Sequence, residues 1–162
     1  MKSSVSRKLT VAFMAGSATM GLSAIAYADA TPACNEAGLQ STECGTQATT
    51  GTAQGATAVG NGAIATGTDA VAIGGDDAGT NPATATGPST VAIGGESDAT
   101  TPGATALGWQ SQATGMMATA VGHQTTASGA QSFAAAEDAV ASGTNSIAIG
   151  NTAVADGGDA IA

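Results

Sequence analysis

The sequence predicts an all-β protein, a parallel β-solenoid in which fourteen residues form one coil. Three observations lead to this prediction. Glycine recurs every seven residues along most of the chain, alanine stands two positions before each of these repeat points, and the intervening residue is alternately apolar and polar. Two short strands and two corners fit into fourteen residues. Each repeat therefore describes one coil, stacked on the previous one at a spacing of about 4.8 Å.

Composition alone would indicate a disordered chain. The 162 residues include 24 glycines, and only 2% are aromatic and 9% charged. After residue 28, Leu, Ile, Val and Phe together make up about 11% of the residues, below the roughly 20% under which chains are usually disordered. Only the regular order of the residues argues against this expectation.

The first 28 residues have the regions of a Sec signal peptide. A basic stretch at residues 2–8 leads into a mostly small and apolar run at residues 9–26, and Ala-Tyr-Ala closes the segment. We expect cleavage after Ala28, with Ala30 as the second choice. The alternative is an amphipathic N-terminal helix of the mature protein. Since no later segment approaches twenty apolar residues, we expect no membrane-spanning helix.

Removal of residues 1–28 would leave a chain without basic residues other than one histidine. Lys2, Arg7 and Lys8 are the only Lys and Arg residues, and all 12 acidic residues follow residue 28, so the mature chain has a formal charge of −12. Phosphate contacts and attraction to anionic lipid both need Lys and Arg. We therefore expect no nucleic-acid partner.

Two cysteines, Cys34 and Cys44, lie in the segment 29–52 that precedes the repeats. In an oxidising compartment such a pair favours a disulfide. Closing so short a loop contributes about 2 to 3 kcal/mol in the chain-entropy model. Metal binding is the weaker alternative, because no histidine or further cysteine stands nearby.

The repeats occupy residues 53–162. A coiled-coil heptad is disfavoured, because glycine costs about 1 kcal/mol in a helix and the neighbouring Val, Ile and Thr favour strands. Glycine also supplies the positive φ of a tight corner. Ile73 and Ile93 are twenty residues apart instead of fourteen, which predicts an inserted loop within residues 74–86. Thr101 and Ala136 replace glycine at two repeat points; the others are Gly60, Gly67, Gly74, Gly87, Gly94, Gly108, Gly115, Gly122, Gly129, Gly143, Gly150 and Gly157.

The two kinds of half-coil predict which side chains face inward. Alanine stands two positions before all fourteen repeat points, from Ala58 to Ala155, and Ala162 continues the same seven-residue spacing, so we expect alanine to fill the narrow space between two sheets. The apolar residues that directly precede every second repeat point then form a ladder on the outside of one sheet. An exposed apolar ladder of this kind marks an interface. The alternative places Val and Ile inside the roll. Ordering costs about 1 to 2 kcal/mol per residue, so an alanine-lined roll favours oligomerisation. We expect interchain packing by Ile93, Leu107, Val121 and Ile149.

Residues 90–94 read Thr-Val-Ala-Ile-Gly and residues 145–150 read Asn-Ser-Ile-Ala-Ile-Gly, alternating with Ala-Thr-Gly and Ala-Ser-Gly corners. This pattern, over about residues 53–162, resembles the head repeats of trimeric autotransporter adhesins, the YadA-like head family. The resemblance implies a left-handed parallel β-roll, a homotrimer, and display at the cell surface on the outer membrane of a Gram-negative bacterium. It also implies multivalent attachment to host matrix, cells or surfaces. Residues 145–150 match a motif that the family connects with matrix binding.

The resemblance has limits. That family carries a coiled-coil stalk and a C-terminal β-barrel anchor, and this sequence contains neither and ends within a repeat. We interpret the chain as an N-terminal fragment that reaches the membrane only through an anchor absent from this chain; a complete product would be secreted. The alternative function is a secreted β-solenoid with an ice-binding or matrix-scaffold role. The polar residues that precede the other repeat points are single Thr, Ser and Asp positions, less regular than the paired threonine arrays of ice-binding solenoids. This irregularity argues against ice binding.

The pattern of titratable residues favours no enzyme, no cofactor and no metal site. His123, the only histidine, follows a corner glycine, where we expect a solvated loop residue and no nucleophile beside it. Acid pairs such as Glu96 with Asp98 do not match a calcium-binding loop. The candidates for ligand contact are Trp109 and the loop residues Asp76 and Asp77. The alternative for Trp109 is packing over the end of the alanine-lined space.

Overall fold

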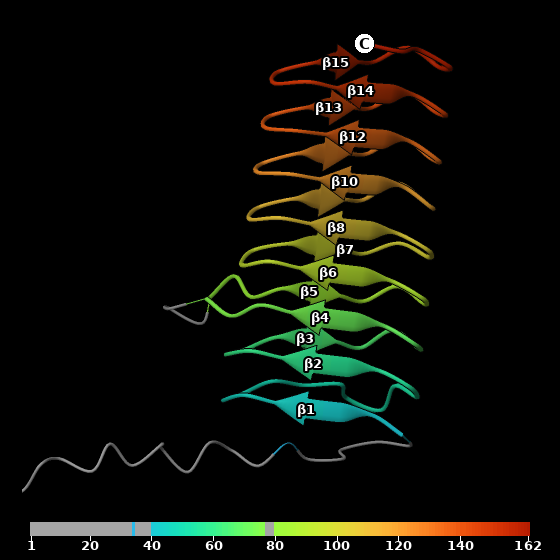
Figure 1. Ribbon diagram of the computed structural model, residues 1–162. Coiled ribbons are helices and arrows are strands. Elements are labelled where there is room, and N and C mark those ends of the chain that lie inside the picture. The colour runs from blue at the N-terminus through green and yellow to red at the C-terminus, as the bar shows by residue number, and fades with distance from the viewer. Residues whose placement is uncertain (1–33, 35–39, 77–79) are drawn as a thin grey trace, which may run out of the picture.

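The computed structural model describes Cys34, residues 40–76 and residues 80–162, which form one stack of coils (Figure 1). The described residues form parallel strands in two sheets and no helix. The eight-stranded apolar sheet contains β1 (Thr42–Cys44), β2 (Thr57–Val59), β4 (Val71–Ile73), β6 (Val91–Ile93), β8 (Thr105–Leu107), β10 (Thr119–Val121), β12 (Phe133–Ala135) and β14 (Ile147–Ile149). The seven-stranded polar sheet contains β3 (Ile64–Ala65), β5 (Thr84–Ala85), β7 (Asp98–Ala99), β9 (Gln112–Ala113), β11 (Thr126–Ala127), β13 (Val140–Ala141) and β15 (Val154–Ala155).

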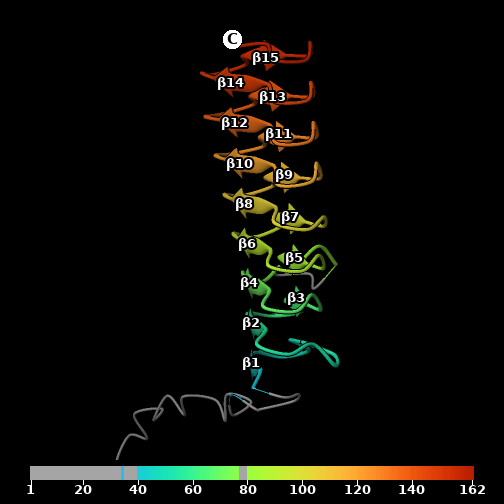
Figure 2. The ribbon, with the colours of Figure 1, turned by 90° about the vertical axis from the view of Figure 1, so that its right-hand side faces the viewer.

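From β2 onward the strands alternate between the sheets along the chain, and each pairs with the equivalent strand of the next coil. Ala120, for example, lies beside Ala106 on one side and Ala134 on the other, each fourteen residues away. Figure 2 shows the two sheets as adjacent columns with the corners at their edges. The predicted all-β parallel solenoid with fourteen-residue coils is confirmed.

Two coils depart from fourteen residues. Ile73 pairs with Ile93, and the amide of Ala83 donates to the carbonyl of Gly74 at 3.2 Å, so six extra residues are accommodated between residues 74 and 83. The predicted insertion is therefore present, and its described residues leave the stack at one side, between β4 and β5 (Figure 1).

The roll also begins earlier than residue 53. Strand β1 pairs with β2 at an offset of fifteen residues, Thr42 beside Thr57. The segment 29–52 thus contributes strand β1 of the first coil. The seven-residue periodicity missed this coil because one additional residue shifts its phase.

Alanine fills the space between the sheets, as the favoured interpretation predicted. The alanines two positions before the repeat points are buried from Ala58 to Ala155, whereas Ala162 is exposed at the end of the described chain. Val and Ile do not enter this core, so the alternative arrangement is wrong.

A second interior column was not foreseen. It lies four positions before each repeat point and holds only Ala, Ser or Thr, which are small enough for the same space. Most of its buried hydroxyls donate to a nearby carbonyl, such as Thr90 Oγ1 to the Gly87 oxygen and Ser132 Oγ to the Gly129 oxygen, both at 2.7 Å. These bonds offset the cost of burying a polar group.

Glycine serves two different purposes at the corners. At repeat points after the apolar sheet it has positive φ, for example 129° at Gly108 and 135° at Gly122, as predicted. At repeat points after the polar sheet φ is not positive, and only the second requirement remains, which both corners share: the coils approach too closely for a side chain, so that a Cβ atom at Gly129 would overlap the carbonyl oxygen of Gly143.

The residue two positions after a repeat point adopts the left-handed conformation, which sequence reasoning missed. Examples are Glu96 at φ 58°, Gln110 at 56° and Asp138 at 55°. A signal was present, because these positions hold mainly Gln, Asp, Asn, Ser, Glu and Gly, and Asn, Asp and Gly tolerate this conformation best.

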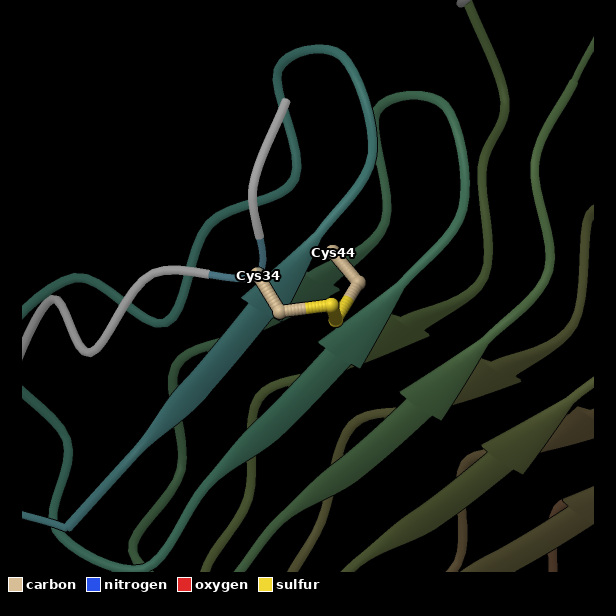
Figure 3. Close-up of a disulfide and its surroundings, with 2 residues drawn as sticks. All are labelled: Cys34 and Cys44. Carbon is tan, nitrogen blue, oxygen red and sulfur yellow. A yellow bond between two sulfur atoms is a disulfide. The ribbon is translucent and has the colours of Figure 1, made fainter. Parts of the chain in front are cut away.

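Cys34 and Cys44 form a disulfide with an S–S distance of 2.07 Å (Figure 3). Cys44 ends β1 and lies beside Val59 of β2. The bond therefore ties the segment before β1 to the first coil of the roll.

Candidate functional site

The outer face of the apolar sheet carries a hydrophobic ladder. In register along the stack lie Ile93, Leu107, Val121, Ala135 and Ile149, so the four predicted interchain residues share one column, interrupted by Ala135. Ile93 is 38% exposed and Ile149 60% exposed in the single chain. The neighbouring column adds further apolar side chains at Val71, Val91, Phe133 and Ile147.

The corner that follows the apolar sheet carries a ladder that joins Trp109, His123, Glu137 and Asn151. The rings of Trp109 and His123 are stacked, with centroids 4.8 Å apart and an interplanar angle of 19°. His123 Nδ1 lies 3.3 Å from Glu137 Oε1, and Asn151 Nδ2 donates to Glu137 Oε2 at 3.2 Å. We call this column the corner ladder. His123 is thus partnered on both sides, and its side chain is 39% exposed on the corner.

Trp109 lies on the surface. Its side chain is 48% exposed, and its recorded ring contact is with His123 one coil further along. One aromatic face is therefore covered by the imidazole.

A second column on the same corner consists of hydrogen-bonded amides and a carboxylate. Gln124 Nε2 donates to Gln110 Oε1 at 2.7 Å, and Gln110 Nε2 donates to Glu96 Oε2 at 2.6 Å. The donors all point toward Glu96, so the ladder ends on its carboxylate. Because successive coils have the same backbone conformation, these side chains are held in line and Glu96 is fixed in position.

This column forms one wall of a pocket of about 570 Å³. The opposite wall is the outer face of the polar sheet, with Asp98, Gln112 and Thr126 on successive coils. The inserted loop closes one end with Thr80, Asn81 and Pro82, and Ile64 and Thr84 complete the lining. We call this space the loop pocket.

Asp98 is the partly buried acid of the loop pocket. Burial raises the pKa of the Asp98 carboxyl above its ordinary value of 3.8, and a hydrogen bond with the Thr84 side chain opposes this rise. Glu96 faces the same pocket. Both carboxylates therefore lie where water is partly excluded, and no Lys or Arg follows residue 8 to neutralise them.

The inserted loop is braced by Asp76. Its Oδ2 accepts hydrogen bonds from the Thr80 amide at 2.8 Å, the Thr80 hydroxyl at 3.0 Å and the Asn81 amide at 3.0 Å. Asp76 thus holds the returning segment of the loop, whereas its predicted partner Asp77 lies outside the described residues. Neither Trp109 nor Asp76 lines the loop pocket itself, although Asp76 is hydrogen-bonded to two of the lining residues, Thr80 and Asn81.

The loop pocket was missed by sequence reasoning, although Glu96 and Asp98 had been noted as a pair. A length of twenty residues between Ile73 and Ile93 reveals an insertion but not the face over which it folds. Among the described residues, no group of three His, Cys, Asp or Glu side chains could hold a metal ion, and no helix is long and apolar enough to cross a membrane.

Comparison with known families gives one match. The model of the YadA head domain repeat matches residues 52–76, 85–111, 113–135 and 141–162, which together cover more than half of the chain. The gap between the first two segments contains the inserted loop. No curated protein matches the chain.

Proposed function

Because this chain belongs to the YadA head domain repeat family, we propose that it is the head of a trimeric surface adhesin that attaches a Gram-negative bacterium to host matrix, cells or other surfaces. The observation that carries the proposal is a repeating rod with an apolar stripe on one sheet and hydrogen-bonding side chains on the other sheet and the corners. Such a rod repeats similar weak contacts along its length.

The apolar stripe supports a trimer. A column of exposed and half-exposed Ile, Leu and Val side chains, interrupted only at Ala135, on a thin, alanine-filled roll is a surface that another chain would cover. Packing this stripe against two other copies would bury it along the shared axis. The polar sheet and the corners would remain outside for ligand contact.

The proposed location follows from the N-terminal residues. Residues 1–28 would direct export, the mature chain would begin at Asp29, and the oxidising environment outside the cytoplasm suits the Cys34–Cys44 bond. We propose no enzymatic activity.

Multivalency would supply the strength of attachment. When several sites of a three-chain rod bind together, the overall avidity exceeds the affinity of a single site by about 10² to 10⁴-fold. The charge of −12 of the proposed mature chain would repel acidic surfaces and favour neutral or basic partners.

The experiment compares beads coated with the wild-type trimer and with a monomerised variant, Val121→Asp, at equal numbers of chains. Retention on matrix proteins and on cultured cells is measured under flow. We expect strong retention of the trimer and weak retention of the variant. Equal retention of both would contradict attachment through multivalency, and absence of retention for both would contradict the adhesin function.

A further inference from the structure

We propose that the loop pocket binds an arginine or lysine side chain of an extended partner polypeptide, held between Glu96 and Asp98. This inference rests on the proposed function, since it names the chemistry of the partner that the adhesin head would grip. The carrying observation is a built cavity of about 570 Å³ with two carboxylates at the end closed by the inserted loop.

The first argument is charge. Glu96 and Asp98 face one cavity, and the chain has no Lys or Arg after residue 8. His123, the one remaining basic side chain, is already paired with Glu137 on the corner ladder. The two carboxylates are therefore left without a counter-charge from their own chain, and a cationic group from outside would supply it.

The second argument is preorganisation. The amide of Gln110 donates to Glu96 Oε2, and Gln124 in turn donates to Gln110, so one carboxylate oxygen is held by a ladder while the other is left to a ligand. Thr84 supports Asp98 from the preceding coil. A guanidinium or ammonium group entering between them would find acceptors already in place, which reduces the entropy cost of binding.

The third argument is shape. The lining rises through three successive coils, from Glu96 and Asp98 through Gln110 and Gln112 to Gln124 and Thr126. At about 4.8 Å per coil this is the length of two or three residues of an extended chain. The exposed Gln112 amide lies along this path, where it can pair with main-chain groups of a peptide. The inserted loop closes one end and so sets where the cationic side chain must stop.

The pocket would stay open in the proposed trimer. It is lined by the polar sheet, the inserted loop and the corner column of Glu96, Gln110 and Gln124, and it shares no residue with the apolar stripe on the other sheet. Three equivalent pockets would then be displayed around one rod.

The test uses the mature chain and fluorescein-labelled peptides that alternate arginine with serine. Matched peptides carry citrulline, which keeps the shape of arginine without its charge, or lysine. Anisotropy titrations at low and at physiological salt give the affinities. We expect the arginine and lysine peptides to bind, the citrulline peptide to bind at least about tenfold more weakly, and affinity to fall with salt.

The decisive variant is the double change Glu96→Gln with Asp98→Gln. Gln110 and Gln124 occupy the column of Glu96, and Gln112 occupies that of Asp98, so the variant repeats a row that the fold already accepts. We expect about a tenfold or greater loss of affinity for the arginine peptide. Asp156→Asn is the matched control, because it removes an exposed acid outside the pocket lining and should change affinity less than twofold.

Three outcomes would overturn the proposal: equal binding of the arginine and citrulline peptides, an affinity of the double variant equal to that of the wild type, or binding of neutral oligosaccharides in the pocket with no binding of basic peptides.

The bead assay separates this proposal from the adhesin function. Suppose that beads coated with the wild type and with the double variant are retained equally, while the variant has lost peptide binding. The pocket would then be a basic-peptide site but not the main attachment site. Retention without any peptide binding would refute the pocket and leave the adhesin function standing.

Discussion

The indole of Trp109 stacks on the imidazole of His123 from the next coil, with ring centroids 4.8 Å apart. The contact exists because equivalent residues of successive coils are one coil spacing apart and their side chains project from the same corner. His123 continues the column to Glu137, and Glu137 to Asn151. One corner thus carries an aromatic stack, a histidine–carboxylate contact and a hydrogen bond in sequence, and these contacts join four coils.

His123→Ala should uncover the stacked face of Trp109. We expect the emission maximum of the sole tryptophan to shift to longer wavelength, and stability to fall by about 0.5 to 1.5 kcal/mol, the usual value of an aromatic pair. Fluorescence and urea denaturation at pH 7 measure both. Gln124→Ala on the same corner is the control and should leave the emission maximum in place. An unshifted maximum in His123→Ala would contradict the stack.

Val121→Asp should disrupt the proposed trimer. It would place an unpaired carboxylate in a buried interface, at a cost of at least about 3 kcal/mol in each chain. Sedimentation equilibrium should give a trimer for the wild type and smaller species for the variant. Ser128→Asp is the control, because Ser128 lies on the polar sheet side and Asp156 already occupies the equivalent position two coils later. A well-folded wild-type monomer at micromolar concentration would rule out this packing.

Asp98 should make the roll less stable at neutral pH than in mild acid. Burial raises the pKa of Asp98 above 3.8, so the folded state binds this proton more tightly than the unfolded chain does. The contribution of Asp98 to stability therefore rises as pH falls from neutral through the raised pKa, and it stays constant below 3.8.

Asp98→Asn removes this charge and keeps an acceptor for Thr84, so it should raise the melting temperature at pH 7 and flatten its dependence on pH. Thermal unfolding from pH 7 to pH 4 measures the effect. Glu96 lines the same pocket, so Glu96→Gln is measured in parallel to separate the contributions of the two carboxyls. A melting temperature of Asp98→Asn below that of the wild type at pH 7 would show that burial is not the dominant influence on this carboxyl.

Gly129→Ala should destabilise the roll strongly, because the added methyl would overlap the carbonyl oxygen of Gly143 in the next coil. Overpacking of this kind costs about 1 to 3 kcal/mol or more, and the adjoining coils would have to separate. Gly158→Ala is the control, since its Cβ would approach only the Thr144 carbonyl oxygen, at 3.8 Å. Equal melting temperatures of the two variants would contradict the close contact between coils.

The sequence by itself determined the coil, its length and the pairing of each strand with the strand one coil away. It left two directions open for the alanines, and their burial between the sheets decided that they point inward. The coil and the strand pairing follow from periodicity, because in a solenoid each residue meets its equivalent fourteen positions away. The insertion was visible as a break in that period. The first coil was not visible in the sequence, because the offset of fifteen residues between Thr42 and Thr57 does not match the fourteen-residue period.

Only the tertiary structure decided what the irregular residues do. Trp109, His123 and Glu137 are unlike one another, so no repeat indicates that they touch; the shared corner brings them together. The same holds for the loop pocket, where Asn81 and Pro82 of the insertion close a space lined by Glu96 and Asp98. The direction in which an inserted loop folds depends on contacts such as those of Asp76 with Thr80, and periodicity carries no information about them, because it describes only what every coil has in common.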